Sequence, residues 1–210
     1  DALKCDGKLV PLDQTKSWLA KSWELKTENK LSLERYASAG GIQFVYSLKS
    51  GISVEELNRE GLYPNRILER AITGEYTAIE TLKDVSHTLA KLYHERIETL
   101  FAGWQSPFSF VNPNRAPLEP SHPYLGKVFD ILIIGQRLGA LMEKSKESIY
   151  LWRPFLSHLE MLISSNVKLD SQTKNHYLEN GLEKMVHISQ LRDAPALGAG
   201  VDAVLHYKQS

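Results

Sequence analysis

The longest patterned stretch of the chain has apolar residues recurring at helical spacing. Between residues 76 and 102 these residues form one stripe over about seven turns, made by Ile79, Leu82, Val85, Leu89, Leu92, Tyr93, Ile97 and Leu100. The remaining positions are mostly polar or charged, and include Glu95 and Glu98. The pattern predicts a long amphipathic helix with one buried face and one charged, solvated face.

Helical signals also precede this stretch. Apolar residues follow helical spacing over 31–48, with Gly40-Gly41 inside the pattern. Two adjacent glycines cost about 1 kcal/mol each in a helix interior, so we expect a kink, a junction or close backbone packing there.

Start signals define two short helices, and a third helix is expected earlier in the chain. Ser53 with Glu56 forms a capping-box pattern that predicts a short helix ending at Gly61. Pro64 suits the first turn of another helix, running to Thr73. A further helix is expected over 15–26.

Strand signals flank the second half of the chain. The apolar run over 127–134 predicts a buried parallel strand that ends at Gly135, and 185–189 predicts the last strand. Helical patterns cover 136–146, 152–164, 171–182 and 197–207, and an Asp-Gly pair predicts a hairpin over 3–10. Strands alternating with helices favour an α/β fold, rich in helix, with a mostly parallel sheet.

Residues 103–126 interrupt this order. They contain Pro107, Pro113, Pro117, Pro120 and Pro123, five of the nine prolines of the chain. Proline lacks the amide hydrogen that helices and central strands need, so an irregular segment is expected here.

Composition narrows the class of protein. The hydrophobic fraction of 42% and the charged fraction of 24% are typical of a soluble globular domain. Lys and Arg number 25, as do Asp and Glu, which gives no electrostatic reason to expect a nucleic acid or a membrane as partner. Cys5 is the only cysteine, which rules out an intramolecular disulfide and fits the reducing cytosol, so a cytoplasmic protein is expected. The chain starts at Asp1, without an initiating methionine, and we therefore expect a fragment or a processed product.

Two segments resemble a known family. Leu31-Ser32-Leu33-Glu34-Arg35-Tyr36-Ala37-Ser38 resembles the C-L-E-x-Y-A-S segment of the ROK family of bacterial sugar kinases and related repressors, and Pro195-Ala196-Leu197-Gly198-Ala199-Gly200 resembles the start of that family's final helix. The order of the elements between them also fits. The resemblance implies that residues 1–210 form one lobe, the C-terminal lobe of an actin-like or hexokinase-like ATPase fold, with 103–126 as an insertion.

The resemblance also implies functional residues. Glu34 corresponds to a carboxylate that contacts the sugar, and Glu24 is the nearest glutamate that could replace an upstream sugar-binding one. Ile133-Ile134-Gly135-Gln136 corresponds to I-x-G-G, a turn beside the adenosine, with Gln136 in place of the second glycine. Gly198 and Gly200 would border the same pocket.

Other family features are absent from all 210 residues. The chain has no D-x-G-G-T phosphate loop, no P-loop motif and no G-x-G-x-x-G motif, and its single cysteine excludes the family's zinc knuckle. The resemblance therefore implies a lobe that binds ATP with magnesium and a sugar, needs no zinc, pairs with a missing N-terminal lobe, forms a homodimer and does not catalyse phosphoryl transfer alone.

Three functions remain open at this point. The chain is the nucleotide- and sugar-binding half of an ATP-dependent sugar kinase, or a degenerate ROK-like binding or regulatory module, or an unrelated helical protein-interaction domain. His87 and His94 lie seven residues apart and share a helix face, where a surface role is favoured over metal binding.

Overall fold

A computed structural model describes residues 4–5, 8–9, 15, 17–27, 31–105 and 107–191. Its helices are α2 (Ala39–Ser50), α3 (Val54–Arg59), α4 (Pro64–Ile72), α5 (Tyr76–Ala102), α6 (Gln136–Ser145), α7 (Trp152–Ser165), α8 (Ser171–Leu178) and α9 (Leu182–Met185), with a 3₁₀ turn η1 at Leu33–Arg35. Its strands are β1 (Lys4–Cys5), β2 (Lys8–Leu9), β3 (Leu25–Lys26), β4 (Ser109–Phe110), β5 (Leu132–Ile134) and β6 (Val186–Ile188).

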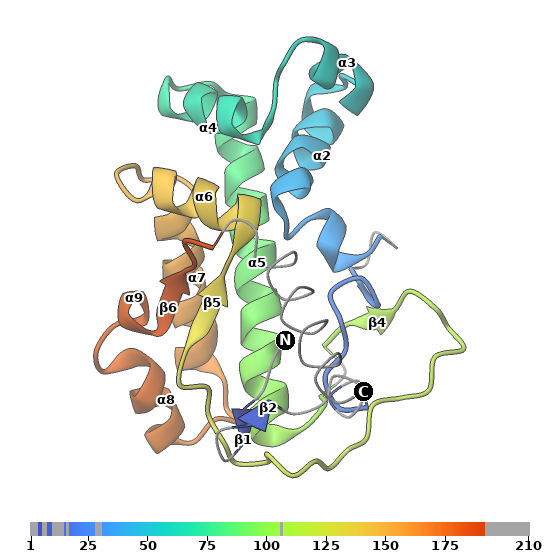
Figure 1. Ribbon diagram of the computed structural model, residues 1–210, viewed down its shortest axis with the longest axis vertical. Coiled ribbons are helices and arrows are strands. Elements are labelled where there is room, and N and C mark those ends of the chain that lie inside the picture. Colours follow the sequence, from blue (N-terminus) through green and yellow to red (C-terminus); the bar gives the residue numbers. More distant parts are fainter. Residues whose placement is uncertain are drawn as a thin grey trace, which may run out of the picture.

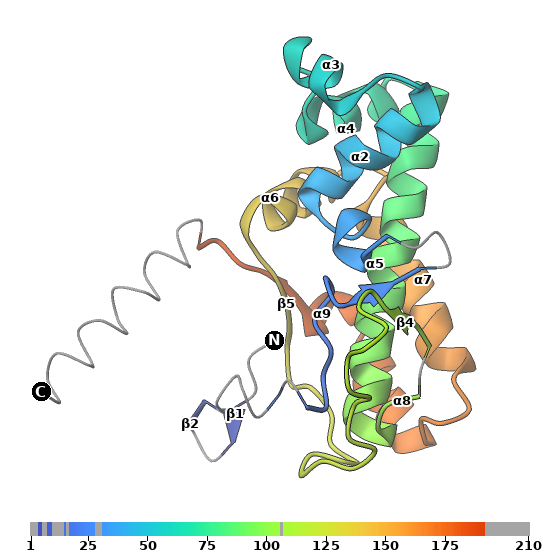
Figure 2. The ribbon, with the colours of Figure 1, turned by 90° about the vertical axis from the view of Figure 1, so that its right-hand side faces the viewer.

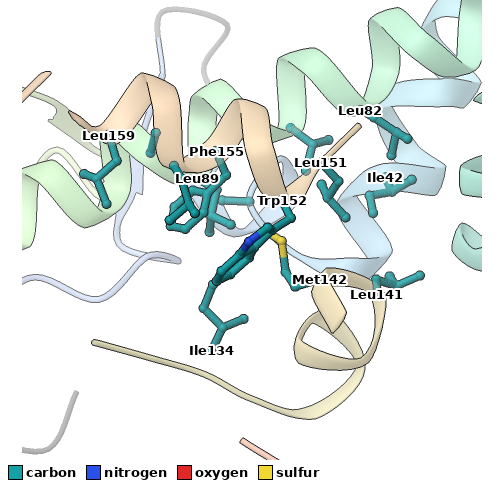
Figure 3. Packing of buried hydrophobic residues seen from close by; sticks show 14 of the residues in the cluster. Ile42, Leu82, Leu89, Ile134, Leu141, Met142, Leu151, Trp152, Phe155 and Leu159 are labelled. Carbon is teal, nitrogen blue, oxygen red and sulfur yellow. The ribbon is translucent and has the colours of Figure 1, made fainter. Parts of the chain in front are cut away.

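Helix α5 is the long axis around which the other elements pack. Its 27 residues span about 40 Å, with α2, α3 and α4 gathered at one end and α7 along its side (Figures 1 and 2). Leu82 and Leu89 of the predicted stripe belong to one buried cluster with Leu151, Phe155 and Leu159, which begin or belong to α7 (Figure 3). The prediction of a long helix with an apolar stripe is confirmed.

The local start signals are also confirmed. The Ser53 side chain accepts a hydrogen bond from the Glu56 amide at 3.2 Å, and α3 ends before Gly61. Pro64 occupies the first turn of α4. The strands of the expected hairpin are present, because β1 and β2 pair antiparallel.

The helix expected over 31–48 is divided at Ser38. Residues 33–35 form η1, and Ser38 then caps α2 by accepting a hydrogen bond from the Gly41 amide at 3.0 Å. A Cβ at Gly41 would lie 2.6 Å from the Tyr36 carbonyl oxygen. A kink, a junction or close backbone packing is expected at the glycine pair. The structure has the junction and the close packing.

The helix expected over 15–26 is wrong. Residues 17–24 form turns, and Leu25–Lys26 forms β3, which pairs antiparallel with β4 in the proline-rich segment. Trp18 stacks on His122 at 5.1 Å between ring centroids, and Leu19 packs beside Leu100 of α5. Tertiary packing of these apolar side chains overrides the weak helical propensity.

The prediction of a mostly parallel sheet is wrong for the described residues. They hold three two-stranded pairs, of which only β5 with β6 is parallel. The buried strand expected over 127–134 is reduced to Leu132–Ile134, and its Ile133 is 63% exposed. Leu132 and Ile134 face the helices while Ile133 faces away, as strand alternation requires. The part of the fold prediction that is confirmed is a helix-rich chain with few strands.

The second half of the chain otherwise follows the expected helices closely. Helices α6 and α7 match the predicted ranges, whereas the helix expected over 171–182 ends at Leu178 and α9 begins separately at Leu182. The last helix expected, over 197–207, lies outside the described residues.

The charged face predicted for α5 is not solvated along its last two turns. Glu95, Arg96 and Glu98 are only 1%, 8% and 7% exposed. The proline-rich segment leaves the lower end of α5 in Figure 1 and returns past it, and residues 17–27 lie beside it. Glu95 pairs with Arg96 and accepts a hydrogen bond from the Thr99 hydroxyl at 2.8 Å, so the buried carboxylate is compensated.

The glycine pair at the start of α2 provides a matched test of the packing. We expect Gly41→Ala to destabilise the protein by about 1–3 kcal/mol, because the new methyl group overlaps the Tyr36 carbonyl. Gly40→Ala is the control, since the nearest atom to its Cβ is the Ser38 Oγ at 4.0 Å and alanine favours the helix. Chemical denaturation of both variants measures the difference, and equal stabilities would contradict the close approach.

Candidate functional site

The turn from β5 into α6 has an unusual backbone. Gly135 is extended, with φ −120° and ψ −175°, and Gln136 follows with φ +55°. Among the described non-glycine residues, only Leu151 also has a positive φ. A left-handed conformation is costly for most L-residues and natural for glycine. Gln136 therefore keeps a backbone conformation that glycine would adopt more easily.

Contacts on both sides fix this turn. The Ser189 amide donates a hydrogen bond to the Ile134 carbonyl oxygen at 2.8 Å, and the Gly139 amide donates to the Gly135 carbonyl oxygen at 2.9 Å. A Cβ at Gly139 would lie 2.9 Å from the Ile134 carbonyl oxygen. Gly139 thus allows α6 to pack directly on the end of β5, and the first amides of α6 lie at a tight strand-to-helix junction.

Glu34 lies in η1 and is exposed. Its neighbours are held by aromatic contacts: the Arg35 guanidinium lies 5.5 Å from the centre of the Phe44 ring, and Tyr36 meets the same ring edge-on at 5.8 Å. The carboxylate itself has no hydrogen bond or ion pair within the described part of the chain. It is thus available to a ligand on the surface.

Glu24 is engaged in structural contacts. Its Oε1 accepts a hydrogen bond from Arg115 Nε at 2.8 Å, and its Oε2 accepts one from the Lys21 amide at 2.8 Å. Burial would raise the pKa of Glu24, but the hydrogen bonds from Arg115 and Lys21 outweigh it and hold the pKa below the ordinary value. The Arg115 guanidinium also lies 4.6 Å from the centre of the Phe110 ring. Glu24 therefore ties residues 21–26 to the proline-rich segment.

The two segments that carry Glu34 and Gln136 attach to helices that contact each other. Ile42 of α2 and Leu141 and Met142 of α6 belong to one buried cluster (Figure 3). Neither Glu34 nor Gln136 lines the cleft described next. Gly198 and Gly200, the other expected nucleotide residues, lie outside the described residues.

A cleft of about 930 Å³ lies between α5, α2 and the β3–β4 pair, where sequence reasoning placed no site. Six of its lining residues are Tyr36, Lys49, Asp84, His87, Lys91 and Phe108. The available signal was the spacing of His87, Lys91 and His94, which puts all three on one face of α5. The walls come from segments far apart in sequence, so this spacing could not reveal a cavity.

His87 and His94 contact different neighbours. His87 stacks on His158 of α7 at 4.2 Å between ring centroids, and His94 Nε2 is 2.9 Å from the Asn166 side-chain nitrogen. Burial, followed by the nearby Lys83 and Lys91 charges, lowers the pKa of His87. Within the part of the chain that is described, no three His, Cys, Asp or Glu side chains are grouped so that they could hold a metal ion.

Comparison with known proteins gives no relative: no protein-family model, no curated protein and no solved structure matches this chain. None of the helices in the described ranges has the length and apolar character needed to cross a bilayer.

The Glu24–Arg115 pair makes a pH-dependent contribution to stability. Because the pKa of Glu24 is lowered in the folded protein, the pair stabilises the fold above the ordinary pKa of 4.5, and this contribution is lost as the pH falls through the lowered value. Arg115→Met should lower the free energy of unfolding at pH 7 by about 1–2 kcal/mol and flatten its decline between pH 5 and 3.

Urea denaturation across this pH range measures the effect. Arg153→Met is the control, because Arg153 is exposed and has no ion pair among the described residues. Parallel pH profiles for wild type and Arg115→Met would show that the pair does not stabilise the fold.

Proposed function

We propose that the β5–α6 turn binds an adenine nucleotide, and that this chain supplies the nucleotide- and sugar-binding lobe of an ATP-dependent sugar kinase with an actin-like or hexokinase-like fold. The observation that carries the proposal is the left-handed backbone of Gln136 at φ +55°. The ROK resemblance has glycine at this position, and the backbone here is the one that glycine favours.

The surroundings of the turn support a ligand beside it. Gly135 leaves the end of β5 without a side chain, and the nearest atom to a Cβ there is the Ser189 Cβ at 3.7 Å. The junction opens α6, a helix of 10 residues whose first amides have no helical partners. Such amides can donate hydrogen bonds to acceptor atoms of the nucleoside, which the resemblance places beside this turn.

In the proposed reaction, this lobe and a partner lobe each supply some of the required groups. Transfer of a phosphoryl group needs magnesium, two phosphate loops and a base that accepts the proton of the sugar hydroxyl. In this proposal the lobe holds the nucleoside through the β5–α6 turn and the sugar through Glu34, whose exposed carboxylate can accept hydrogen bonds from paired hydroxyls. The base and the first phosphate loop come from an N-terminal lobe.

A second candidate function is a non-catalytic binding or regulatory module of the same fold. The contacts of Glu24 favour it, because Arg115 and the Lys21 amide occupy both carboxylate oxygens of this expected sugar ligand. The presence of a side chain at Gln136 points the same way, since it narrows the space at the turn.

The backbone of Gln136 generates a direct test. Gln136→Gly and Gln136→Ala both remove the polar side chain, but only glycine removes the Cβ that opposes the left-handed conformation. We expect the glycine variant to be more stable than the alanine variant by about 1 kcal/mol. It should also bind magnesium-ATP more tightly than the wild type, since the turn becomes open to the nucleotide.

Thermal unfolding with and without magnesium-ATP checks both expectations. At a nucleotide concentration of about 100 Kd, binding adds roughly 2.7 kcal/mol to the free energy of unfolding. Stabilisation by ATP and ADP that is absent with inorganic phosphate supports a nucleoside pocket. If nucleotide stabilises neither the wild type nor Gln136→Gly nor Gln136→Ala, the proposal of nucleotide binding is rejected. The non-catalytic module then becomes the favoured function.

Glu34 tests the sugar site separately. If its carboxylate accepts hydrogen bonds from sugar hydroxyls, Glu34→Ala should abolish any stabilisation by sugar while leaving unfolding without sugar unchanged, because the side chain is exposed. Glu160→Ala, at an exposed position of α7, is the matched control. Equal sugar responses in wild type and Glu34→Ala would refute this role.

A further inference from the structure

The cleft between α5, α2 and the β3–β4 pair has an excess of positive charge. Lys49 pairs with Asp84 at 2.8 Å, and Glu95 is compensated by Arg96. Lys26 and Lys91 also line the cleft, from β3 and α5, and neither has a carboxylate partner in the described part of the chain. Two ammonium groups from different walls therefore face one space with their charge uncompensated.

One buried polar atom without a partner lies in the cleft lining, and a second lies behind it. The Thr27 hydroxyl oxygen is buried and has no hydrogen-bond partner, although Thr27 lines the cleft directly after Lys26. His158 Nε2 is likewise buried without a partner; His158 does not itself line the cleft, but its ring stacks on His87, which does. A buried polar atom without a partner is costly, and a ligand or water that bonds to it removes this cost.

The cleft also has apolar lining residues. Leu33, Tyr36, Leu48 and Phe108 line it, and Leu48 is 60% exposed there. An exposed leucine and two aromatic rings that line the same cleft suit a planar or apolar group of a ligand. A volume of about 930 Å³ is within the range of small-molecule sites.

We propose that this cleft binds a small phosphate monoester, with the phosphate between Lys26 and Lys91 and the rest of the molecule against Tyr36 and Phe108. A phosphate monoester carries a charge of about −1.5 to −2 at pH 7, which matches two lysines better than a carboxylate does. The positive charges of Lys26 and Lys91 disfavour binding of a metal cation in the cleft. Neither Gln136 nor Glu34 lines the cleft, so this site is independent of the nucleotide turn proposed above.

The nearby imidazoles provide a signature of binding. Burial and then the charges of Lys83 and Lys91 lower the pKa of His87, and burial followed by His87, Lys91 and His94 lowers that of His158. A phosphate between the lysines opposes this positive potential. Binding should therefore raise the pKa of His87, which an NMR titration of the histidine ring protons detects.

The test measures binding of adenosine 5′-monophosphate, ribose 5-phosphate and inorganic phosphate to the full chain by isothermal titration calorimetry. Lys26→Gln and Lys91→Gln should each weaken binding of the monoesters at least tenfold, and Lys91→Arg should restore most of it. Lys184→Gln is the control, because Lys184 lies on α9 and does not line the cleft. Both tested lysines lack partners among the described residues, so the variants are expected to fold.

The outcomes separate the possible occupants. Binding of both monoesters with these losses supports a site for phosphorylated sugars, and binding of the nucleotide alone supports one in which the base occupies the apolar wall. Lysine variants that bind as the wild type does, or the absence of monoester binding at millimolar concentration, would overturn the proposal. Gln136→Gly should leave monoester binding at the cleft unchanged. The cleft can therefore be tested separately from nucleotide binding at the β5–α6 turn.

Discussion

Helix α5 can remove its apolar stripe from water only by packing against α7 along one side and against α2 and α4 near its start. Leu82, Leu89 and Phe155 are fully or almost fully buried as a result. This packing also positions α6, which contacts α2, α4 and α7 and is joined by β6. The candidate turn and the cleft both depend on where these helices lie along α5.

The elements that depend on local signals could be predicted from the sequence. Ser53 and Pro64 define helix starts through the chemistry of their own side chains, and the stripe of α5 repeats over enough turns to be unambiguous. The burial of Glu95 could not be predicted in this way. It depends on residues 17–27 and the proline-rich segment, which cover the end of α5 from distant parts of the chain.

The candidate site also has parts that the sequence predicts and parts that depend on contacts between distant segments. The strand, glycine and helix around Gly135 were visible in the sequence, but the left-handed conformation of Gln136 was not, because a glutamine by itself indicates no such backbone. Glu24 looked available until Arg115 was placed beside it. The cleft was missed altogether, since Lys26 and Lys91 become neighbours of one cavity only when β3 packs against the helices.

The contact between Glu24 and Arg115 also bears on the order in which the protein folds. These residues are 91 positions apart, and β3 pairs with β4 across a similar separation. Closing so long a loop costs entropy before any contact compensates for it, whereas the caps and turns of α3 and α4 form locally. We therefore expect the helical half around α5 to assemble first and the β3–β4 ribbon to close over it last. A chain emerging from the ribosome would then expose Trp18, Leu19 and Leu25 at least until residue 118 and its neighbours had been synthesised.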